Sequence, residues 1–574
     1  MQRDLSALQN KTFDLVVIGG GITGACLAAD AAMRGLSVAL VEKNDFGGAT
    51  SSASSKLLHG GIRYLQQLNF AKVRESARER IYFQQLAPHL TRYIPFIIPT
   101  YTGLSKGRFV MRSAMVLYEL ICSGLNGLLQ DAAKRVPGSR MLTRAEVSER
   151  VPGIAAERLT GGVAFYESHM YSSERMTLAF VECAVQHGAV AANYLEVKAF
   201  TGIEEGRVRG VTVTDRLDNQ QFDISATLVV NAAGPWIPVL NQHLEQGMAE
   251  HGKNESIVSA YSKGAHIVAR PLTRDVAVAL PTRKQNQAVI NRGGRHVFII
   301  PWRGYSLIGT TYGAFKDDLD NVGATDADID EMLEDINAAF AEKEGHNVES
   351  KALERKDVVH AFAGIYPLVD DVIQNNVYQG TGKYQVVDHG ESHRMEGLFS
   401  VFGAKYTTAR LLAEKALDRI VAKLDREVKP CQTRNCRLPA GDIEDLQAFR
   451  EAQRRRYGDK LAAEVIDKLV TQYGTHTGDL LDLIETEAEL GRALRENGTT
   501  LEAQIVYAAR NEMACHLEDV IFRRTGLGTV GNPGEAVLLR CATLMGRELG
   551  WSPQRIDQEV KQTLSRFPVQ QSNV

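Results

Sequence analysis

Residues 13–24 read FDLVVIGGGITG, an apolar run typical of a strand followed at once by a G-x-G-x-x-G pattern. The glycines of that pattern are Gly19, Gly21 and Gly24. Glycine lets the backbone turn sharply and approach a pyrophosphate, and the N-terminus of a following helix favours the negative charge. The stretch therefore predicts a phosphate-binding turn between a strand and a helix.

The residues after this turn complete a nucleotide-binding unit. Residues 25–33 are rich in alanine and predict a helix that Gly35 ends, and residues 37–41 predict a second strand. Glu42 stands at the end of that strand, where a carboxylate accepts hydrogen bonds from a ribose. The order of strand, turn, helix, strand and acid predicts an adenine dinucleotide, but it does not separate FAD from NAD.

Small hydroxyl side chains dominate residues 49–56, which read ATSSASSK. Hydroxyls and backbone N–H groups suit a second line of contacts along a long cofactor, although serine runs are also typical of solvated loops. The candidate contacts are Ser51, Ser52, Ser54, Ser55 and Lys56. The run leads into LLHGGIRYL at residues 57–65.

Together these segments resemble the FAD-dependent (aerobic) glycerol-3-phosphate dehydrogenases, whose N-terminal pattern is present almost unbroken. The resemblance continues in order along the chain. It is carried by LVVNAAGPW at 228–236, KGAHIV at 263–268, IPW at 300–302, IGTT at 308–311, FSVFGAKYTTAR at 399–410, RRY at 455–457, QYG at 472–474 and residues 519–525. Several separate motifs in one order are more specific than any single motif.

The resemblance implies an α/β fold: a two-lobed flavoprotein with a Rossmann-like FAD-binding domain, a mixed-sheet substrate domain and an all-α C-terminal domain. The oxidoreductase region spans 1–430, with FAD-binding segments at about 12–65, 155–240 and 395–425. The substrate lobe occupies about 66–154 and 241–394. Gly234 and Gly403 belong to the flavin side. The implied cofactor is FAD.

Around the substrate pocket, the family places the positions that match His59, Arg63, Tyr64, Lys405 and Thr408. We assign Arg63 and Lys405 to a phosphate, because Arg presents a planar fork to two oxygens and Lys a point charge. The alternative for Arg63 is a surface cation on a helix. The H-G-G-x-R-Y context favours the phosphate assignment.

A flavin accepts the hydride itself, so the protein needs a group that removes the hydroxyl proton rather than a nucleophile. His266 is the leading candidate base by side-chain chemistry, with His59 also placed among the catalytic residues. The alternative for His266 is a histidine that is hydrogen-bonded within a strand. His360 is a weaker second candidate.

The chain departs from the family at two positions. Tyr366 replaces the arginine of G-x-R-P-L, and Tyr312 replaces the aspartate of G-T-T-D. If the two groups are neighbours, the double change removes an ion pair without stranding a buried partner, which is the costly case. Tyr366, which we also place at the catalytic centre, would wall the pocket with an aromatic face. The exact substrate is therefore open, and a larger or less charged polyol phosphate is an alternative.

Three functional readings follow. The first is a dehydrogenase of glycerol metabolism that oxidises sn-glycerol 3-phosphate, or a related polyol phosphate, and passes electrons to a quinone. The second is an oxidase that uses oxygen. The third is a catalytically silent flavin-binding sensor or scaffold, against which the presence of Arg63, Lys405 and His266 argues.

Composition and charge limit which partners and which cellular compartment we expect for this protein. The 574 residues carry a net charge of −3, so no general basic field indicates nucleic acid. Seven scattered cysteines suit a reducing compartment, and Cys431 and Cys436 lack a partner set of metal spacing, so we expect no metal. The charged first residues lead straight into the strand at Phe13, so we expect no signal peptide.

Membrane contact is implied by the resemblance, which also implies a homodimer. We expect a cytoplasmic protein that associates peripherally with the inner face of the cell membrane. No stretch reaches the ~18 apolar residues of a spanning helix. Residues 106–134 carry an apolar stripe with basic flanks, which fits either a helix in the bilayer interface or an amphipathic helix on the protein's own core.

The character of the sequence changes after residues 439–442, PAGD. Helical periodicity is predicted over 446–455, 460–473, 477–485 and 501–525, with no strand run of comparable strength. Pro439 and Gly441 mark the joint. We therefore expect a separate helical domain over 440–574 that ends in a polar tail.

Overall fold

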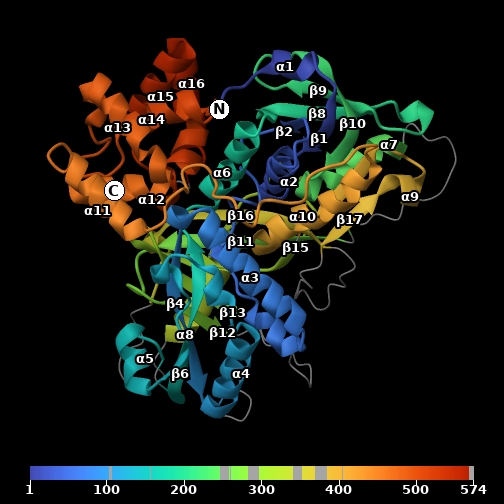
Figure 1. Ribbon diagram of the computed structural model, residues 1–574. Coiled ribbons are helices and arrows are strands. Elements are labelled where there is room, and N and C mark those ends of the chain that lie inside the picture. The colour runs from blue at the N-terminus through green and yellow to red at the C-terminus, as the bar shows by residue number, and fades with distance from the viewer. Residues whose placement is uncertain are drawn as a thin grey trace.

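Two sheets and a group of helices form the molecule, for which a computed structural model describes residues 1–102, 107–155, 157–245, 258, 260–281, 296–340, 352–368, 384–403 and 405–567. Figure 1 shows the flavin-side lobe at the upper right, the substrate sheet below it and the C-terminal helices at the upper left. The predicted two-lobed α/β flavoprotein fold with an additional helical domain is confirmed.

The first sheet contains the predicted nucleotide-binding strands. Its order is β17 (Gln385–Asp388), β18 (Leu398–Phe402), β10 (Gln221–Asn231), β1 (Phe13–Ile18), β2 (Val38–Val41) and β7 (Val190–Ala192), and β8 (Leu195–Thr201) and β9 (Gly210–Asp215) extend it from β10. Neighbours from β18 to β7 are parallel. β1 and β2 are almost continuously apolar because such strands are covered on both faces.

Small side chains allow close packing on one face of this sheet. Helix α2 (Ile22–Met33) is buried along nearly its whole length and packs against α6 (Ser173–Gln186) and α10 (Ala409–Ile420). Its alanines and glycine leave little side-chain bulk between the helices. The N-terminus of α2 is thus fixed beside the ends of β1 and β18.

The second sheet is mostly antiparallel and carries the substrate side. Its order is β15 (Gly313–Phe315), β11 (Ala260–Ala269), β14 (Tyr305–Gly309), β13 (His296–Trp302), β12 (Ala277–Pro281), β4 (Thr91–Tyr101), β6 (Leu159–Met170) and β3 (Leu57–Leu58), with β16 (Val358–Leu368) on β11 and β5 (Arg140–Leu142) on β6. β13 and β14 form a hairpin that turns at Arg303 and Gly304.

Three segments lie across the lobe boundaries expected from sequence. Residues 57–58 and 159–170 were expected on the flavin side, but they form β3 and β6 of the substrate sheet. β6 pairs with β4 along almost its full length, and β3 pairs with β6. β17 pairs with β18 in the flavin-side sheet rather than in the substrate lobe.

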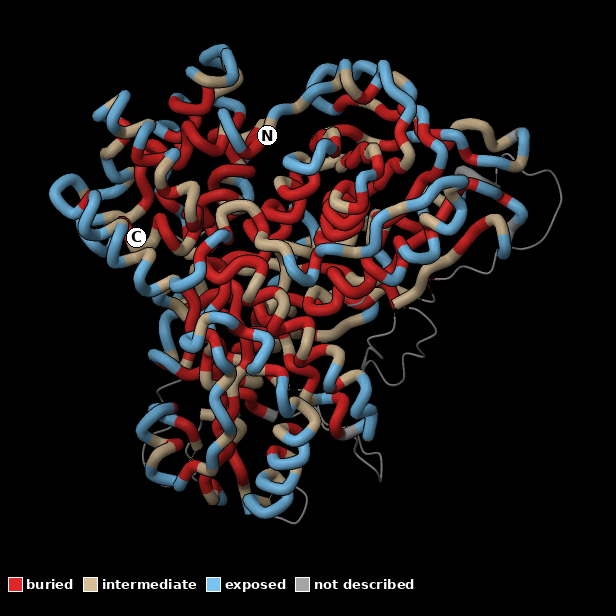
Figure 2. Tube along the Cα trace, viewed as in Figure 1, coloured by how far each residue is buried: buried red, intermediate tan, exposed pale blue. Residues whose placement is uncertain are grey.

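Outside the sheets, the substrate lobe carries α3 (Phe70–Leu86), α4 (Arg108–Ile121), α5 (Arg144–Arg150) and α8 (Asp326–Phe340). Figure 2 shows that the strands are mainly buried, whereas the lower end of the molecule, where α4 lies, is mainly exposed. Only Met115 and Tyr118 of α4 are buried, while Phe109 is 85% and Leu120 66% exposed. Met111, Ala114, Ile121 and Cys122 are partly buried beside these two, so one face of α4 packs on the protein's own core while other apolar side chains stay exposed. Lys106 lies outside the described residues.

The C-terminal part is helical, as predicted. Its helices are α11 (Leu446–Tyr457), α12 (Ala463–Tyr473), α13 (Thr477–Thr486), α14 (Glu502–Asn511), α15 (Glu535–Leu549) and α16 (Pro553–Leu564). They enclose their own hydrophobic core. The single helix expected over 501–525 is wrong: α14 ends at Asn511, Met513 has φ +52°, and a π-helical turn follows at Asp519–Arg524. The expected tail, 569–574, lies outside the described residues.

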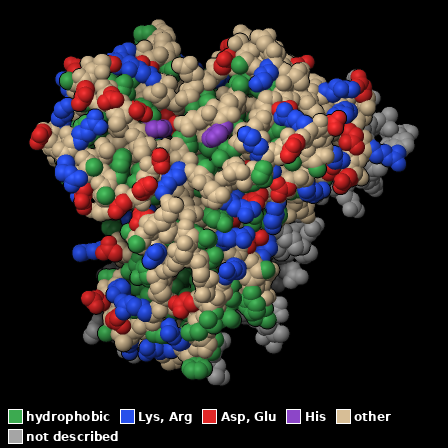
Figure 3. All heavy atoms as spheres, viewed as in Figure 1, with side chains coloured by type: hydrophobic (Ala, Val, Ile, Leu, Met, Phe, Trp, Pro, Cys, Tyr) green, Lys and Arg blue, Asp and Glu red, His purple; other side chains and the backbone are tan. Residues whose placement is uncertain are grey.

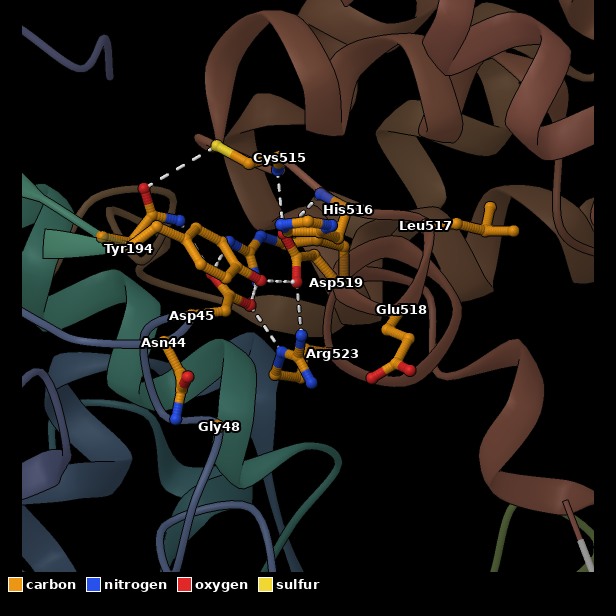
Figure 4. A network of polar contacts seen from close by, with 12 residues as sticks. Asn44, Asp45, Gly48, Tyr194, Cys515, His516, Leu517, Glu518, Asp519 and Arg523 are labelled. Carbon is orange, nitrogen blue, oxygen red and sulfur yellow. Dashed lines mark hydrogen bonds and ion pairs between the residues drawn. The ribbon is translucent and has the colours of Figure 1, made fainter. Parts of the chain in front are cut away.

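That irregular segment joins the helical domain to the flavin-side lobe (Figure 4). Asp45 is buried and accepts hydrogen bonds from Arg523 and from both terminal nitrogens of Arg524. Asp519 accepts the Tyr194 hydroxyl at 2.6 Å and also pairs with Arg523. Burial opposes the charge of Asp45, but Arg524 and Arg523 outweigh it and lower its pKa to about 2. The carboxylate is therefore charged and firmly paired.

Candidate active site

The glycine turn has no room for side chains. A Cβ on Gly24 would lie 1.8 Å from the carbonyl oxygen of Gly19, and Gly19 itself has φ +103°. Gly21 is the N-cap of α2 and has no side chain to cap the helix. The backbone thus forms a cradle at a helix N-terminus, which fits a pyrophosphate.

Glu42 is positioned at this cradle by the backbone. Its two oxygens accept the N–H groups of Gly20 at 2.7 Å and Asn44 at 2.8 Å. Burial raises the pKa of Glu42, and the two N–H bonds oppose that shift. The carboxylate stands beside the glycines as the nucleotide-binding pattern requires, where it fits a ribose of FAD.

Two serines of the 49–56 loop connect the flavin side to its surroundings. Ser51 accepts the backbone N–H of Ile22, the first residue of α2, at 2.9 Å. The Ser55 hydroxyl lies 2.9 Å from Nε2 of His266. The loop therefore contacts both the nucleotide cradle and the substrate sheet.

The other predicted loop contacts face the protein. The Ser52 hydroxyl donates to Ala49, and the Ser54 hydroxyl accepts the N–H of Lys56. The Lys56 ammonium is buried and bonded to Ser52 O, Ser173 Oγ and Glu174 Oε1. Lys56 thus holds the loop in place.

Gly234 and Gly403 lie just after the C-terminal ends of β10 and β18, the two strands on one side of β1 in the sheet. Gly234 has φ +56° after β10. Gly403 follows β18, and a Cβ there would lie 3.0 Å from the Thr23 hydroxyl of α2. Gly403 is therefore next to the glycine turn; its neighbour Ala404 lies outside the described residues.

A row of paired residues crosses the substrate sheet at His266. Gly309 lies opposite His266 on one side and Phe362 on the other, while Phe298 pairs with Gly309. A Cβ on Gly309 would lie 2.2 Å from the imidazole, so glycine leaves the space for the ring. The ring stacks on Phe362 at 5.2 Å. His266 is therefore fixed on the face that meets the serine loop.

Burial and the nearby Lys56 cation lower the pKa of His266 to about 3. The ring is therefore neutral at physiological pH. Nδ1 has no hydrogen-bond partner among the described residues. The other candidate, His360, lies near Phe362 but stacks on Phe522 of the C-terminal domain at 5.9 Å. His266 therefore has the better position.

The predicted phosphate-binding residues form one cationic cluster. The Lys405 ammonium lies 3.9 Å from the centre of the Tyr64 ring. Arg63 is exposed, but it lies close enough to lower the pKa values of His59 and Lys405. His59 contacts Phe298 ring to ring at 5.8 Å. The cluster thus adjoins the row that carries His266.

Burial controls the charges in this cluster. Burial, Lys405 and Arg63 lower the pKa of His59 to about 3. Burial, Lys72 and Arg63 lower the pKa of Lys405 to about 7, although Glu167 opposes the shift. Glu167 is itself paired with Arg80, so the positive charges of Arg63, Lys72 and Lys405 exceed the negative charge near them and favour a bound anion.

Several residues of this cluster were not predicted from sequence. Glu167 on β6 accepts the N–H of Gly60 at 2.7 Å and pairs with Arg80 at 3.0 Å. Thr407, rather than the predicted Thr408, accepts the N–H of His59 at 3.1 Å. Thr408 is buried at the N-cap of α10. In the sequence, the only sign of this arrangement is the acidic Glu167 within a strand, and that sign does not identify the groups that Glu167 contacts.

The two unusual tyrosines flank strand β11. Tyr366 on β16 lies opposite Ser262, and Tyr312 directly precedes Gly313, which lies opposite Lys263 on the other edge. Tyr366, Gly364 and Phe362 alternate along β16, so they share one face of the sheet. A Cβ on Gly364 would lie 2.8 Å from Ala53 of the serine loop. Tyr366 is thus on the face that meets the flavin-side loop.

Among the described residues, no group of histidine, cysteine and acidic side chains has a metal-binding arrangement. The described helices include none that is long and apolar enough to cross a bilayer.

Comparison with known proteins gives the same picture. A model of FAD-dependent oxidoreductases matches residues 14–419, and a model of the C-terminal domain of alpha-glycerophosphate oxidase matches 431–556. A glycerol-3-phosphate dehydrogenase of Synechocystis is 31% identical over 97% of both chains. One from Mycobacterium leprae is 33% identical over 96% of this chain and 87% of its own.

A solved structure extends the similarity to the fold. The glycerol-3-phosphate dehydrogenase from Bacillus halodurans, complexed with FAD, has a TM-score of 0.73 and 29% identity, covering 98% of this chain and 95% of its own. The glycine cradle and Glu42 fit that cofactor. The chain is therefore a FAD-dependent oxidoreductase that belongs to the glycerol-3-phosphate dehydrogenase family.

Proposed function

We propose that this enzyme oxidises sn-glycerol 3-phosphate, or a closely related polyol phosphate, to the ketone and passes the electrons to a quinone. For glycerol 3-phosphate the ketone is dihydroxyacetone phosphate. The observation that carries the proposal is the cationic cluster of Arg63 and Lys405 beside the row that holds His266. The names of the relatives support the same substrate.

Substrate binding depends on the cluster in this proposal. Lys405 is held over the Tyr64 ring at a site where burial weakens its charge. A bound phosphate restores that charge, and exposed Arg63 supplies a bidentate fork from the solvent side. The substrate is thereby held by its phosphate, with its carbinol free to reach toward the sheet.

Proton removal is assigned to His266. Ser55 fixes the ring through Nε2, and the neutral imidazole is the group that takes the hydroxyl proton. When bound, FAD supplies the two-electron acceptor. Stacking on Phe362 keeps the ring in one orientation during the reaction.

Membrane contact and quinone access are supported by α4. Its exposed apolar side chains include Phe109, Val110, Leu117 and Leu120, and Arg108 and Arg112 lie on the same helix. Figure 3 shows hydrophobic side chains gathered at the lower end of the molecule, over the region of α4. Apolar residues beside basic ones suit a peripheral contact with an anionic bilayer. A homodimer remains part of the proposal through the family resemblance alone.

The test is anaerobic titration of the holoenzyme with glycerol 3-phosphate, related polyol phosphates, glycerol and hydroxy acids, followed by flavin absorbance. Bleaching by phosphorylated polyols, and by glycerol far more weakly, is expected. No bleaching by any of them would favour the silent flavin-binding alternative. Re-oxidation rates with a soluble quinone analogue and with oxygen then decide between dehydrogenase and oxidase.

A further inference from the structure

A basic cavity has a lining that includes none of the residues of the glycine cradle, the Arg63–Lys405 cluster or the His266 row. Its volume is about 840 Å³, within the range of small-molecule sites. The walls come from the start of β4, the tip of the β13–β14 hairpin, residues 131–134, and helices α11 and α12. The cavity therefore lies where the substrate sheet meets the C-terminal domain.

The lining is strongly unbalanced in charge. Its cations are Arg92, Lys134, Arg274, Arg303 and Arg450, and its one acidic residue is Asp131. Within the described part of the chain, none of these five cations makes an ion pair with a carboxylate. Of the five, Lys134 is buried, and it lacks the carboxylate partner that another buried cation, Arg410, has in Glu79.

Buried polar atoms in the lining also lack partners. His169 is 1% exposed, and neither of its ring nitrogens has a hydrogen-bond partner among the described residues. The same holds for Nδ1 of His89 and the hydroxyl of Thr273, each 3% exposed. Orphaned buried donors are rare in folded proteins and call for a partner.

Two of the cations, Lys134 and Arg303, are held in place by hydrogen bonds to the protein. The Lys134 ammonium donates to the carbonyls of Pro88 at 2.7 Å and Thr91 at 2.5 Å. Arg303 donates to Gly526 and Thr529 of the C-terminal domain, and its Nε has no partner among the described residues. Burial and Arg450 lower the pKa of Lys134 to about 8, with Asp131 opposing the shift. An anion in the cavity would relieve this repulsion.

The remaining wall is aromatic. Tyr93, Tyr171, Trp302 and Tyr305 line the cavity beside the arginines. Arg303 already lies over the Trp302 ring at 4.6 Å. Planar guanidinium groups suit phosphate oxygens, and aromatic faces suit the apolar or ring part of an organic ligand.

We propose that this cavity is a second binding site, for an organic phosphate monoester of nucleotide size. The phosphate would contact the cations of α11 and residues 131–134, and the organic part would lie against the aromatic wall. Because the walls belong to the substrate sheet and the helical domain, an occupant would hold the two together.

Binding of AMP to the FAD-loaded enzyme by calorimetry tests the proposal, with inorganic phosphate as competitor. We expect one AMP per chain, displaced by phosphate. Arg450→Gln and the exposed-residue change Arg274→Gln should each weaken binding about tenfold or more, as expected for loss of a charge-assisted contact. Arg455→Gln on the exposed side of α11 is the matched control and should bind normally.

Arg63→Gln separates this cavity from the phosphate cluster at the active site, and it should leave AMP affinity unchanged. Flavin content and thermal midpoint show that each variant is folded; Arg274 is exposed, so its change keeps the test valid if Arg450→Gln misfolds. Three results would overturn the proposal: no AMP binding at millimolar concentration, equal loss in Arg455→Gln, or loss of AMP binding in Arg63→Gln.

Discussion

The Ser55 hydroxyl lies 2.9 Å from Nε2 of His266, although the two residues are 211 positions apart. Ser55 belongs to the loop that also contacts the N-terminus of α2 through Ser51. The flavin cradle and the candidate base are therefore joined by one short loop. A change that moves this loop should affect cofactor binding and substrate oxidation together.

Replacing Gly24 by alanine should abolish stable FAD binding. A Cβ would lie 1.8 Å from the Gly19 carbonyl oxygen, which is backbone and has no room to move away. The wild-type protein should be yellow, with one FAD per chain, and the variant should be largely colourless. The absorbance ratio at the flavin and protein bands measures this.

The control for that change is Gly478→Ala, since a Cβ at Gly478 meets nothing within 4 Å. It should retain full flavin content. A Gly24→Ala protein that is folded and fully yellow would show that the glycine turn does not hold the cofactor.

Lys405→Met should raise KM for the phosphorylated substrate by about 10- to 100-fold, because a charge-assisted contact is lost in a buried site. Arg63→Gln should raise KM less, by about 3- to 10-fold, since solvent screens an exposed charge. Steady-state kinetics with the phosphate and with its unphosphorylated polyol measure the effect. FAD content should be unchanged.

Arg150→Gln, which changes an exposed cation on α5, serves as the control and should leave KM as it is. Variants that lose activity equally on phosphorylated and unphosphorylated substrates would show that the cluster does not recognise phosphate.

Substrate affinity should fall as the pH rises above about 7. The pKa of Lys405 is lowered to about 7, so in the free enzyme its ammonium is present below that pH and is lost above it. Only the charged form attracts a phosphate dianion, and binding must return the proton. KM measured from pH 6 to 9 should therefore rise on the alkaline side.

Lys405→Arg is the informative comparison, because arginine stays protonated throughout this range. Its KM should vary much less with pH, whatever its absolute value. An identical alkaline rise in the variant would assign the effect to another group.

Tyr366→Arg should destabilise the protein by about 1–3 kcal/mol, because it places an unpaired charge in a partly buried strand. Tyr312→Asp added to it should recover part of that loss, since Tyr366 on β16 and Tyr312, directly before β15, lie on either side of β11. The double variant should also reduce its flavin faster with glycerol 3-phosphate. A double-mutant cycle on thermal stability and reduction rate measures the coupling.

Strict additivity in both measurements would show that the two tyrosines are independent. Wild-type preference for glycerol 3-phosphate over every other polyol phosphate would show that they do not alter specificity.

Phe109→Glu with Leu120→Glu should weaken binding to anionic liposomes by at least about tenfold, because each removes an exposed apolar side chain from α4. Co-sedimentation measures binding. Leu539→Glu, at an exposed leucine of α15, is the matched control. If all three proteins co-sediment equally, α4 is not the membrane contact.

The nucleotide-binding unit was predictable because its signals are contiguous. Gly19, Gly24 and Glu42 lie within one strand–turn–helix–strand segment, where local geometry fixes their roles. The cationic cluster was less accessible, because Glu167 and Thr407 meet His59 only after distant strands and helices pack. Lys405 and Arg63 were predicted from the family resemblance, but neither composition nor motif spacing predicted the residues that surround them.

Two further features, the exposure of α4 and the end of the helix expected over 501–525, could be determined only from the folded structure. The sequence of α4 fits either a core helix or an interface helix, and only the packed structure shows that Phe109 faces out. The helix expected over 501–525 breaks because Asp519 accepts the backbone N–H groups of Cys515 and His516, at 2.8 and 2.9 Å. Such a local bond from a side chain to the backbone competes with the helix and overrides helical periodicity.

The pairing of Asp45 with Arg523 and Arg524 bears on how this architecture is inherited. A chain shortened at Pro439 would lose both arginines that pair with Asp45 and leave that carboxylate without its ion-pair partners, three residues after Glu42. We therefore expect that the helical domain cannot be lost in evolution by a single deletion without a further change in the flavin-side lobe. Descendants that lose it must also replace Asp45, and the acid and the two arginines should disappear together.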